Sequence, residues 1–205
     1  MANEAVIHVI DDDDAARDSL VFLLDTAGMR TRAYESPMLF LEALPFSKPA
    51  CIVTDIRMPE MTGIELLRRL HQTDPHLPVI LITGHADVPL AVEAMKLGAA
   101  DFIEKPFNDE LLVAAVQSAI SRHADGEQLD AGRAAASARI AALSERERQV
   151  LEGLVTGNPN KTIAYDLGIS PRTVEVYRAN LMTKMQASSL SHLVRMALLA
   201  QGLRG

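Results

Sequence analysis

Acidic side chains gather at two places in the first third of the chain. Four successive aspartates at positions 11–14 follow the apolar run 5–10, and Asp55 directly follows the apolar run 50–54. Grouped carboxylates repel one another unless a cation lies among them, and oxygen ligands favour a hard ion such as Mg²⁺. This pattern predicts a divalent-cation site, provided that the fold brings the two places together.

The four successive aspartates also have a simpler interpretation as helix caps. A helix is expected to begin within or directly after them, and negative charges stabilise the positive end of a helix. We assign Asp13 and Asp14 to this capping role. Asp11 and Asp12, together with Asp55, are assigned to the metal site.

A lysine and a hydroxyl are expected near the same point. Lys105 follows the run 101–104, and Thr83 ends the run 78–83. In open parallel sheets, ligands bind at the edge formed by the carboxyl ends of the strands. A phosphoryl group needs a nucleophile, cationic partners for its oxygens and a hydrogen-bond donor, and these residue types supply all of them. Asp55 is the candidate nucleophile.

The elements that must position these groups alternate in type along the chain. Short apolar, β-branched runs are separated by segments that carry apolar residues at helical spacing. Such alternation predicts a parallel sheet with helices on both faces. The expected strands are residues 5–10, 30–34, 50–54, 78–83 and 101–104.

Residues 5–122 resemble the receiver domain of two-component response regulators. The motifs that carry the resemblance are Asp11-Asp12, the segment 55–63, Thr83-Gly84 and the segment 102–106. The resemblance implies an α/β fold, a doubly wound, flavodoxin-like sheet of five parallel strands. It also implies that Asp55 accepts a phosphoryl group from a partner sensor histidine kinase. The implied Mg²⁺ ligands are Asp11, Asp12, Asp55 and the backbone carbonyl of Arg57.

The same resemblance assigns the remaining receiver residues. Thr83 and Lys105 would bind the phosphoryl oxygens, and the Lys105-Pro106 bond would be cis. Phe102 occupies the aromatic switch position, where the ring turns inward once the threonine moves toward the phosphate. An ordinary core phenylalanine is the alternative for this residue.

The rest of the chain changes in composition and then becomes helical. Residues 1–124 are expected to form the receiver, 125–142 a partly helical linker rich in small and polar residues, and 143–205 an all-α four-helix domain. Ser144 and Glu147 form a capping box, and Gly168 followed by Ser170-Pro171 ends one helix and starts the next. This outline predicts a helix-turn-helix, although any small helical bundle has the same outline.

A helical wheel divides the third of these helices, residues 171–185, into two faces. Val174, Tyr177, Leu181 and Met185 form an apolar stripe that should pack inward. The opposite face is free for a partner. It carries Arg172, Glu175, Val176, Ala179 and Thr183.

The segments 143–147, 160–164 and 167–175 resemble the output domain of LuxR-type transcription factors. The resemblance implies that the helix 171–185 enters the major groove of DNA. The residues implied to face bases are Glu175, Val176 and Ala179, and those implied to lie near phosphates are Lys161, Arg172, Thr173, Arg178 and Lys184. Arg178 has an alternative interpretation as a solvated surface charge, and the negative charge of Glu175 costs affinity for DNA unless it accepts from a base.

Charge and composition are compatible with this division. Residues 1–124 contain 10 Lys and Arg against 19 Asp and Glu, a net charge of −9, whereas residues 144–205 contain 8 against 5, a net of +3. The asymmetry permits a nucleic-acid surface in the second part. The lone cysteine, Cys51, lies among apolar residues and is expected to be buried and reduced. No signal-like or bilayer-length apolar run is present, so a cytoplasmic location is expected.

Receiver and output domains together resemble the response regulators that control nitrogen-fixation genes. The resemblance implies a transcription activator whose partners are a sensor kinase, promoter DNA and RNA polymerase. Phosphorylation would turn a monomer into a homodimer through the face that holds Val92, Lys96, Phe102, Ile103 and Glu104. Two output domains then suit a two-fold related DNA site.

Two other functions fit parts of the pattern. A Mg²⁺-dependent phosphohydrolase would also use Asp55, but the phosphatases with such a nucleophile need a carboxylic acid two residues later, where Arg57 stands. Turnover of an external substrate is therefore not expected, and only slow loss of the protein's own phosphate is. A receiver whose helical end binds protein instead of DNA is the second alternative.

Overall fold

The computed structural model describes residues 5–44, 50–84, 88–124 and 128–201, and the side chains of these residues except within 122–131. The chain forms two compact units. The first comprises Met1–His85 with Leu97–Gly126, and the second comprises Ala86–Lys96 with Glu127–Gly205. The domain boundaries predicted from composition differ from this division, because α4 (Val88–Lys96) groups with the second unit.

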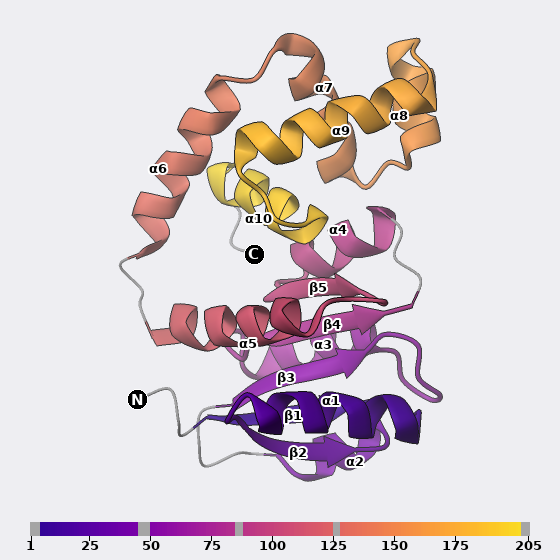
Figure 1. Ribbon diagram of the computed structural model, residues 1–205, viewed down its shortest axis with the longest axis vertical. Coiled ribbons are helices and arrows are strands. Elements are labelled where there is room, and N and C mark those ends of the chain that lie inside the picture. Colours follow the sequence, from indigo (N-terminus) through magenta and orange to yellow (C-terminus); the bar gives the residue numbers. More distant parts are fainter. Residues whose placement is uncertain (1–4, 45–49, 85–87, 125–127, 202–205) are drawn as a thin grey trace. The chain divides into compact units, whose positions relative to one another are not determined.

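The first unit contains a five-stranded parallel sheet in the order β2-β1-β3-β4-β5 (Figure 1). Each strand begins and ends within one residue of the predicted run. Residues of the central strands β3 and β4 are almost entirely buried, as their continuous apolar sequence requires. The strands are β1 Val6–Ile10, β2 Arg30–Tyr34, β3 Ala50–Asp55, β4 Val79–Thr83 and β5 Asp101–Glu104.

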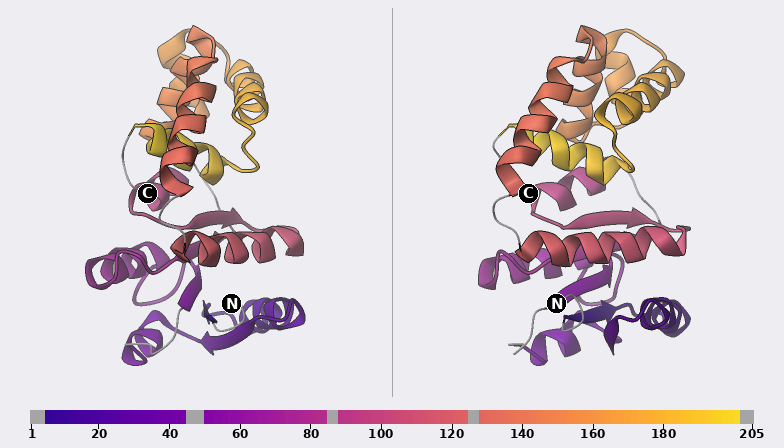
Figure 2. Two further views of the ribbon diagram at one scale, coloured as in Figure 1. Left: turned by 90° about the vertical axis from the view of Figure 1, so that its left-hand side faces the viewer. Right: turned by 60° about the vertical axis from the view of Figure 1, so that its left-hand side comes forward.

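Helices cover both faces of this sheet (Figure 2). Helices α1 (Asp14–Thr26) and α5 (Asp109–Ala124) lie on one face, and α2 (Pro37–Glu42) and α3 (Gly63–Thr73) on the other. The core beneath α1 and α5 joins side chains from both helices to those of β1, β3, β4 and β5, and it includes Cys51. The expected burial of this cysteine is confirmed.

Local hydrogen bonds fix where these helices start. The carboxylate of Asp13 accepts from the amide of Ala16, and Asp14 lies in the first turn of α1, so the capping role predicted for both aspartates is confirmed. Ser36 caps α2 directly before Pro37. Because Asp13 caps α1 only three residues after the end of β1, the β1–α1 connection is short and Asp11 stays close to the end of β1.

The second unit is helical, and α4, which groups with it, is a helix as well. Its core consists of apolar residues from all five of the helices that follow α5. Helix α8 ends at Leu167, and Gly168 after it has a left-handed φ of 65°. Ser170 then caps α9, whose first residue is Pro171. The predicted helix-turn-helix is present. The helices are α6 Gln128–Ala141, α7 Glu145–Thr156, α8 Asn160–Leu167, α9 Pro171–Met185 and α10 Leu190–Ala200.

Among the helices that the structure describes, none combines the length and the apolar character that a bilayer crossing requires.

Candidate functional site

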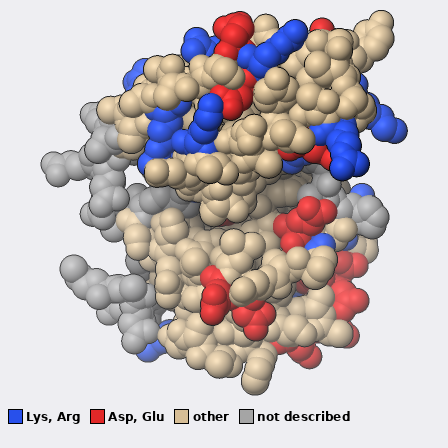
Figure 3. All heavy atoms as spheres, turned by 45° about the horizontal axis from the view of Figure 1, so that its top comes forward, with Lys and Arg blue, Asp and Glu red and all other residues tan. Residues whose placement is uncertain are grey.

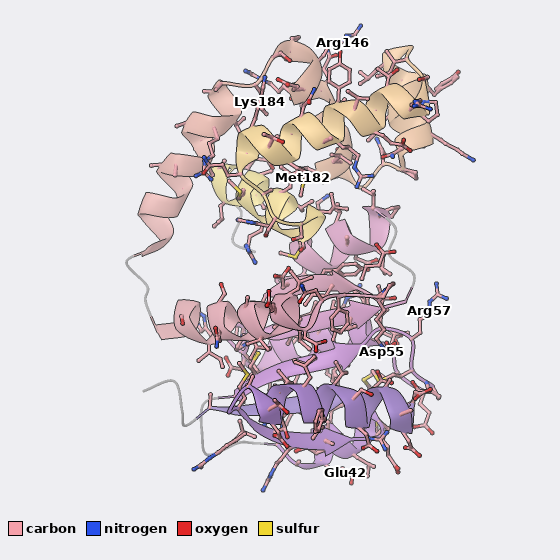
Figure 4. All side chains as sticks on the ribbon, in the orientation of Figure 1. Glu42, Asp55, Arg57, Arg146, Met182 and Lys184 are labelled. Carbon is pink, nitrogen blue, oxygen red and sulfur yellow. The ribbon has the colours of Figure 1, made fainter. Side chains whose placement is uncertain are left out.

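The chemistry-bearing residues of the first unit lie at one edge of the sheet. Asp11 directly follows β1, Asp55 is the last residue of β3, Thr83 ends β4 and Lys105 directly follows β5. Because neighbouring strands run parallel and in register, their carboxyl ends meet at this edge. Figure 4 shows Asp55 there, at the ends of the strand arrows.

The Lys105 ammonium joins the two carboxylates. Its Nζ donates to Asp55 Oδ1 over 2.9 Å and to Asp11 Oδ2 over 3.1 Å. The side chain of Asp11 is 3% exposed and that of Asp55 is 13% exposed, whereas that of Lys105 is 30% exposed. Asp11, Asp55 and Lys105 are thus brought together as predicted, across 50 and 94 positions of sequence.

Burial shifts the pKa values in this cluster and makes its charged forms depend on their neighbours. Burial raises the pKa of Asp11, and this effect outweighs the hydrogen bond from the amide of Asp13 and the attraction of Lys105. Burial alone would lower the pKa of Lys105, but its hydrogen bonds and its attraction to Asp55 and Asp11 together raise that pKa. A cation between the two carboxylates therefore stabilises their charged forms.

The backbone holds the Asp55 carboxylate in place from the other side. Asp55 Oδ2 accepts from the amide of Arg57 over 2.6 Å. The Arg57 side chain is exposed and points away from the site (Figure 4). Residue 57 therefore contacts the Asp55 carboxylate through its backbone amide and not through its side chain.

The donor set suits a hard divalent cation. Asp11 and Asp55 supply carboxylate oxygens, and both reach one cationic atom, the Lys105 nitrogen. Within the described ranges, however, no three His, Cys, Asp or Glu side chains form a metal-type cluster. Asp12 is exposed, so the three predicted carboxylates do not come together in this conformation.

The two remaining receiver candidates are buried. Thr83 is fully buried at the end of β4, and Phe102 on β5 is 6% exposed. The peptide bond between Lys105 and Pro106 is cis, as the resemblance implied.

Two further residues shape the site: Arg17, which the sequence analysis did not single out, and Gly63, which closes the receiver-like motif 55–63. Arg17 donates from Nη1 to the Asp11 carbonyl over 2.8 Å and also pairs with Asp14, and its side chain is only 14% exposed. Gly63 donates to the Ile56 carbonyl, and a Cβ at this position would lie 2.3 Å from the backbone oxygen of Asp55. The sequence signal for Arg17 was its position three residues after the acidic residue Asp14.

The recognition-helix candidate α9 has the two faces that the helical wheel predicted. Val174, Leu181 and Met185 are buried, and Tyr177 is half-buried. The opposite face is exposed, and Val176 has 56% of its surface accessible. The other exposed residues of that face are Arg172, Glu175, Ala179 and Thr183.

Two of the basic residues assigned to phosphates, Arg178 and Lys184, have partners within the protein. Arg178 donates to the Asn160 side chain over 3.0 Å and thereby links α9 to the start of α8. Lys184 lies 2.8 Å from Glu147, at the start of α7. Lys161 and Arg172 are exposed, and Thr173 is half-buried and bonded to Ser170.

Charge differs between the two units on the face drawn in Figure 3. There the helical unit presents most of the Lys and Arg side chains in view, and the first unit presents more Asp and Glu. The surface agrees with the charge asymmetry of the sequence.

Comparison with known families covers both units. The model of the response regulator receiver domain matches residues 7–117, and the model of bacterial regulatory proteins of the luxR family matches residues 141–197.

Full-length relatives share this arrangement. The transcriptional regulatory protein FixJ of Azorhizobium caulinodans is 59% identical over 201 residues, covering 98% of this chain and 95% of the relative. FixJ of Rhizobium meliloti is 53% identical over 94% of each chain. A crystal structure of full-length FixJ from B. japonicum has a TM-score of 0.58 and 54% identity, covering 98% of this chain and 99% of that one. The chain belongs to the FixJ-like response regulators, phosphorylation-activated transcription factors that join a receiver domain to a luxR-type DNA-binding domain.

Proposed function

We propose that Asp55 is the phosphoacceptor of this regulator. One Asp55 carboxylate oxygen attacks the phosphorus of a phosphohistidine on the sensor kinase. An oxygen–phosphorus bond forms, the phosphorus–nitrogen bond breaks, and the imidazole nitrogen keeps the electron pair. The observation that carries this proposal is the contact of one ammonium, that of Lys105, with both Asp55 and Asp11.

A Mg²⁺ ion, held by Asp11, Asp12, Asp55 and the carbonyl of Arg57, would neutralise charge on the transferred group. Asp12 is exposed, so it has to turn inward to join the other ligands. Asp11 and Asp55 already share a cation, and burial, which raises the pKa of Asp11, makes its carboxylate form costly unless positive charge lies beside it.

Lys105 and Thr83 then stabilise the phosphorylated form. The Lys105 ammonium passes from the carboxylates to a phosphoryl oxygen, and the Thr83 hydroxyl donates to another. The Phe102 ring follows the movement of Thr83 as the aromatic switch. Slow hydrolysis of the acyl phosphate returns the protein to its starting state, without turnover of an external substrate.

The phosphorylated receiver is proposed to form a homodimer through α4 and β5. Lys96 and Glu104 on this face are exposed, whereas the other proposed contacts, Val92, Phe102 and Ile103, are buried in this conformation. Dimerisation would bring two output domains to a two-fold related promoter site, where the protein recruits RNA polymerase and activates nitrogen-fixation or related genes.

On DNA, α9 is proposed to lie in the major groove. Its exposed face presents Glu175, Val176 and Ala179 to bases. Lys161 and Arg172 are exposed and support contacts to phosphates, joined by Thr173, Arg178 and Lys184. Because Arg178 and Lys184 have protein partners, their phosphate contacts have to be shared with Asn160 and Glu147 or replace them.

Intact-mass spectrometry tests the phosphoacceptor. The full chain is incubated with acetyl phosphate and Mg²⁺, and the added phosphate is located by peptide mapping after borohydride reduction. We expect one phosphate on Asp55 and none in Asp55→Asn, while the exposed control Asp18→Asn on α1 is phosphorylated normally. Equal labelling of Asp55→Asn would contradict the proposal. Released phosphate from common monoesters would instead support the phosphohydrolase.

A further inference from the structure

Helix α6 lies between the ranges matched by the two family models, 7–117 and 141–197, and shares only its last residue, Ala141, with the second range. Its composition predicted a linker. In the structure, α6 packs within the second unit, chiefly against α10 and also against α9. Ala136 is 1% exposed and Ile140 is half-buried, so one side of α6 belongs to the core of this unit.

One α6 side chain reaches the end of α9. Arg139 Nη1 donates to the Met185 carbonyl over 3.1 Å, and Arg139 Nη2 donates to Gln186 Oε1 over 2.5 Å. The partners lie 46 and 47 positions later in the chain. Both branches of the guanidinium fork are therefore directed at the terminus of the recognition helix.

This terminus needs such a partner. The last carbonyls of a helix have no partner within the helix, and a cation there is favoured by the helix dipole. The amides of Gln186 and Ala187 return to Thr183 and Met182, respectively. The Met185 carbonyl accepts a hydrogen bond from the Arg139 guanidinium. Gln186 itself has a φ of 55°, a conformation that is costly without glycine, and its side chain is held by the same arginine.

We propose that Arg139 is a positioning residue for DNA recognition, and that α6 is a fifth helix of the DNA-binding domain. This inference rests on the proposed entry of α9 into the major groove. Arg139 fixes the last turn of α9, and Ala179 and Val176 lie about 1.7 and about 2.5 turns before Met185 on the same helix. A change in the tilt of α9 displaces the side chains that read bases, because base contacts require defined hydrogen-bond geometry.

Binding to two DNA duplexes separates positioning from direct contact. The unmodified, acetyl-phosphate-treated full chain first selects a duplex from a random library. Fluorescence anisotropy then measures affinity for this selected duplex and for its scrambled sequence at several salt concentrations. We expect Arg139→Ala to lose about tenfold in affinity for the selected duplex, comparable to one mismatched base pair. Affinity for the scrambled duplex and the salt dependence should stay unchanged.

Matched variants make the test specific. Arg133→Ala removes the same charge from an exposed position of α6 and should bind both duplexes like the unmodified chain. Arg139→Lys keeps the charge but lacks the fork, so it should recover only part of the loss. Gln186→Gly removes one acceptor and the positive-φ cost together, and should give a smaller loss than Arg139→Ala.

Four results would overturn the inference. A loss of affinity for both duplexes, with a salt slope reduced by about one, would make Arg139 a phosphate contact. Unchanged affinity of Arg139→Ala for both duplexes would make the contact mere packing. A loss of helical circular dichroism along with all binding would make Arg139 a folding residue. Failure of the unmodified chain to enrich any duplex would overturn the proposed DNA recognition together with this inference, whereas the other three results would overturn the inference alone.

Discussion

Lys184 Nζ lies 2.8 Å from Glu147 Oε2, and this ion pair joins the last turn of α9 to the first turn of α7 (Figure 4 labels Lys184). The Glu147 carboxylate also accepts from the amide and the hydroxyl of Ser144. One side chain therefore serves both as a helix cap and as a link between two helices. The Glu147 side chain is 6% exposed, so water does not readily replace these partners.

The Glu147 network makes the helical unit sensitive to acid. The hydrogen bond from Lys184, followed by those from Ser144, lowers the pKa of Glu147 to about 2. A carboxyl with a lowered folded-state pKa stabilises the fold above its unfolded value near 4.5, and this contribution is lost as the pH falls toward 2. Thermal unfolding of the full chain between pH 6 and 2 should show this loss. It should be smaller in Glu147→Gln, whereas exposed Glu152→Gln should retain it.

His8 should give the receiver a second, separate pH dependence. Burial, followed by repulsion from Arg32, lowers the pKa of His8 to about 4. Its Nδ1 is 3.1 Å from the Tyr34 hydroxyl, and its ring also packs against Phe40. The unfolded chain takes up the proton at higher pH than the folded one, so stability should fall as the pH drops from 6.5 toward 4.

Urea unfolding at several pH values measures the His8 contribution. The slope between pH 6.5 and 4 should be smaller in His8→Phe than in the unmodified chain. Tyr34→Phe keeps the imidazole buried and should preserve the slope. Equal slopes for His8→Phe and the unmodified chain would show that other groups cause the dependence.

Gly63 should not tolerate a side chain. A Cβ would lie 2.3 Å from the Asp55 carbonyl oxygen and 3.1 Å from the Ile56 Cα, and both are backbone atoms that cannot easily yield. We expect Gly63→Ala to lower the free energy of unfolding by roughly 1–3 kcal/mol or more, and to slow phosphorylation of Asp55. Gly132→Ala on α6 meets nothing within 4 Å and should stabilise its helix by about 0.5–1 kcal/mol. Urea denaturation of both variants provides the comparison.

A divalent cation should be able to replace the contribution of the Lys105 ammonium to folding stability. Lys105→Met leaves the nearly buried Asp11 and the Asp55 carboxylate without a shared cation, which should cost about 3 kcal/mol or more of folding free energy. Millimolar Mg²⁺ should restore much of this loss if it binds between the carboxylates. Exposed Arg69→Met should respond little to Mg²⁺. Thermal midpoints with Mg²⁺ and with EDTA measure the effect, and an equal response of both variants would argue against the site.

The sequence alone determined the elements and the edge at which the site lies. Strand runs, the caps at Asp13, Ser36, Ser144 and Ser170, and the two faces of α9 depend on neighbours within a few residues, so local patterns are sufficient to predict them. The placement of Asp11, Asp55 and Lys105 at one edge follows from parallel strands that end in register.

Only the tertiary structure decided which partners the long polar side chains bind. Lys184 pairs with Glu147, Arg178 with Asn160, and Arg139 with the end of α9, because helices distant in sequence bring these groups within reach. Likewise, Asp12 is exposed while its neighbour Asp11 is buried. Spacing specifies the face on which a residue lies, but the packing of distant elements sets what that face meets.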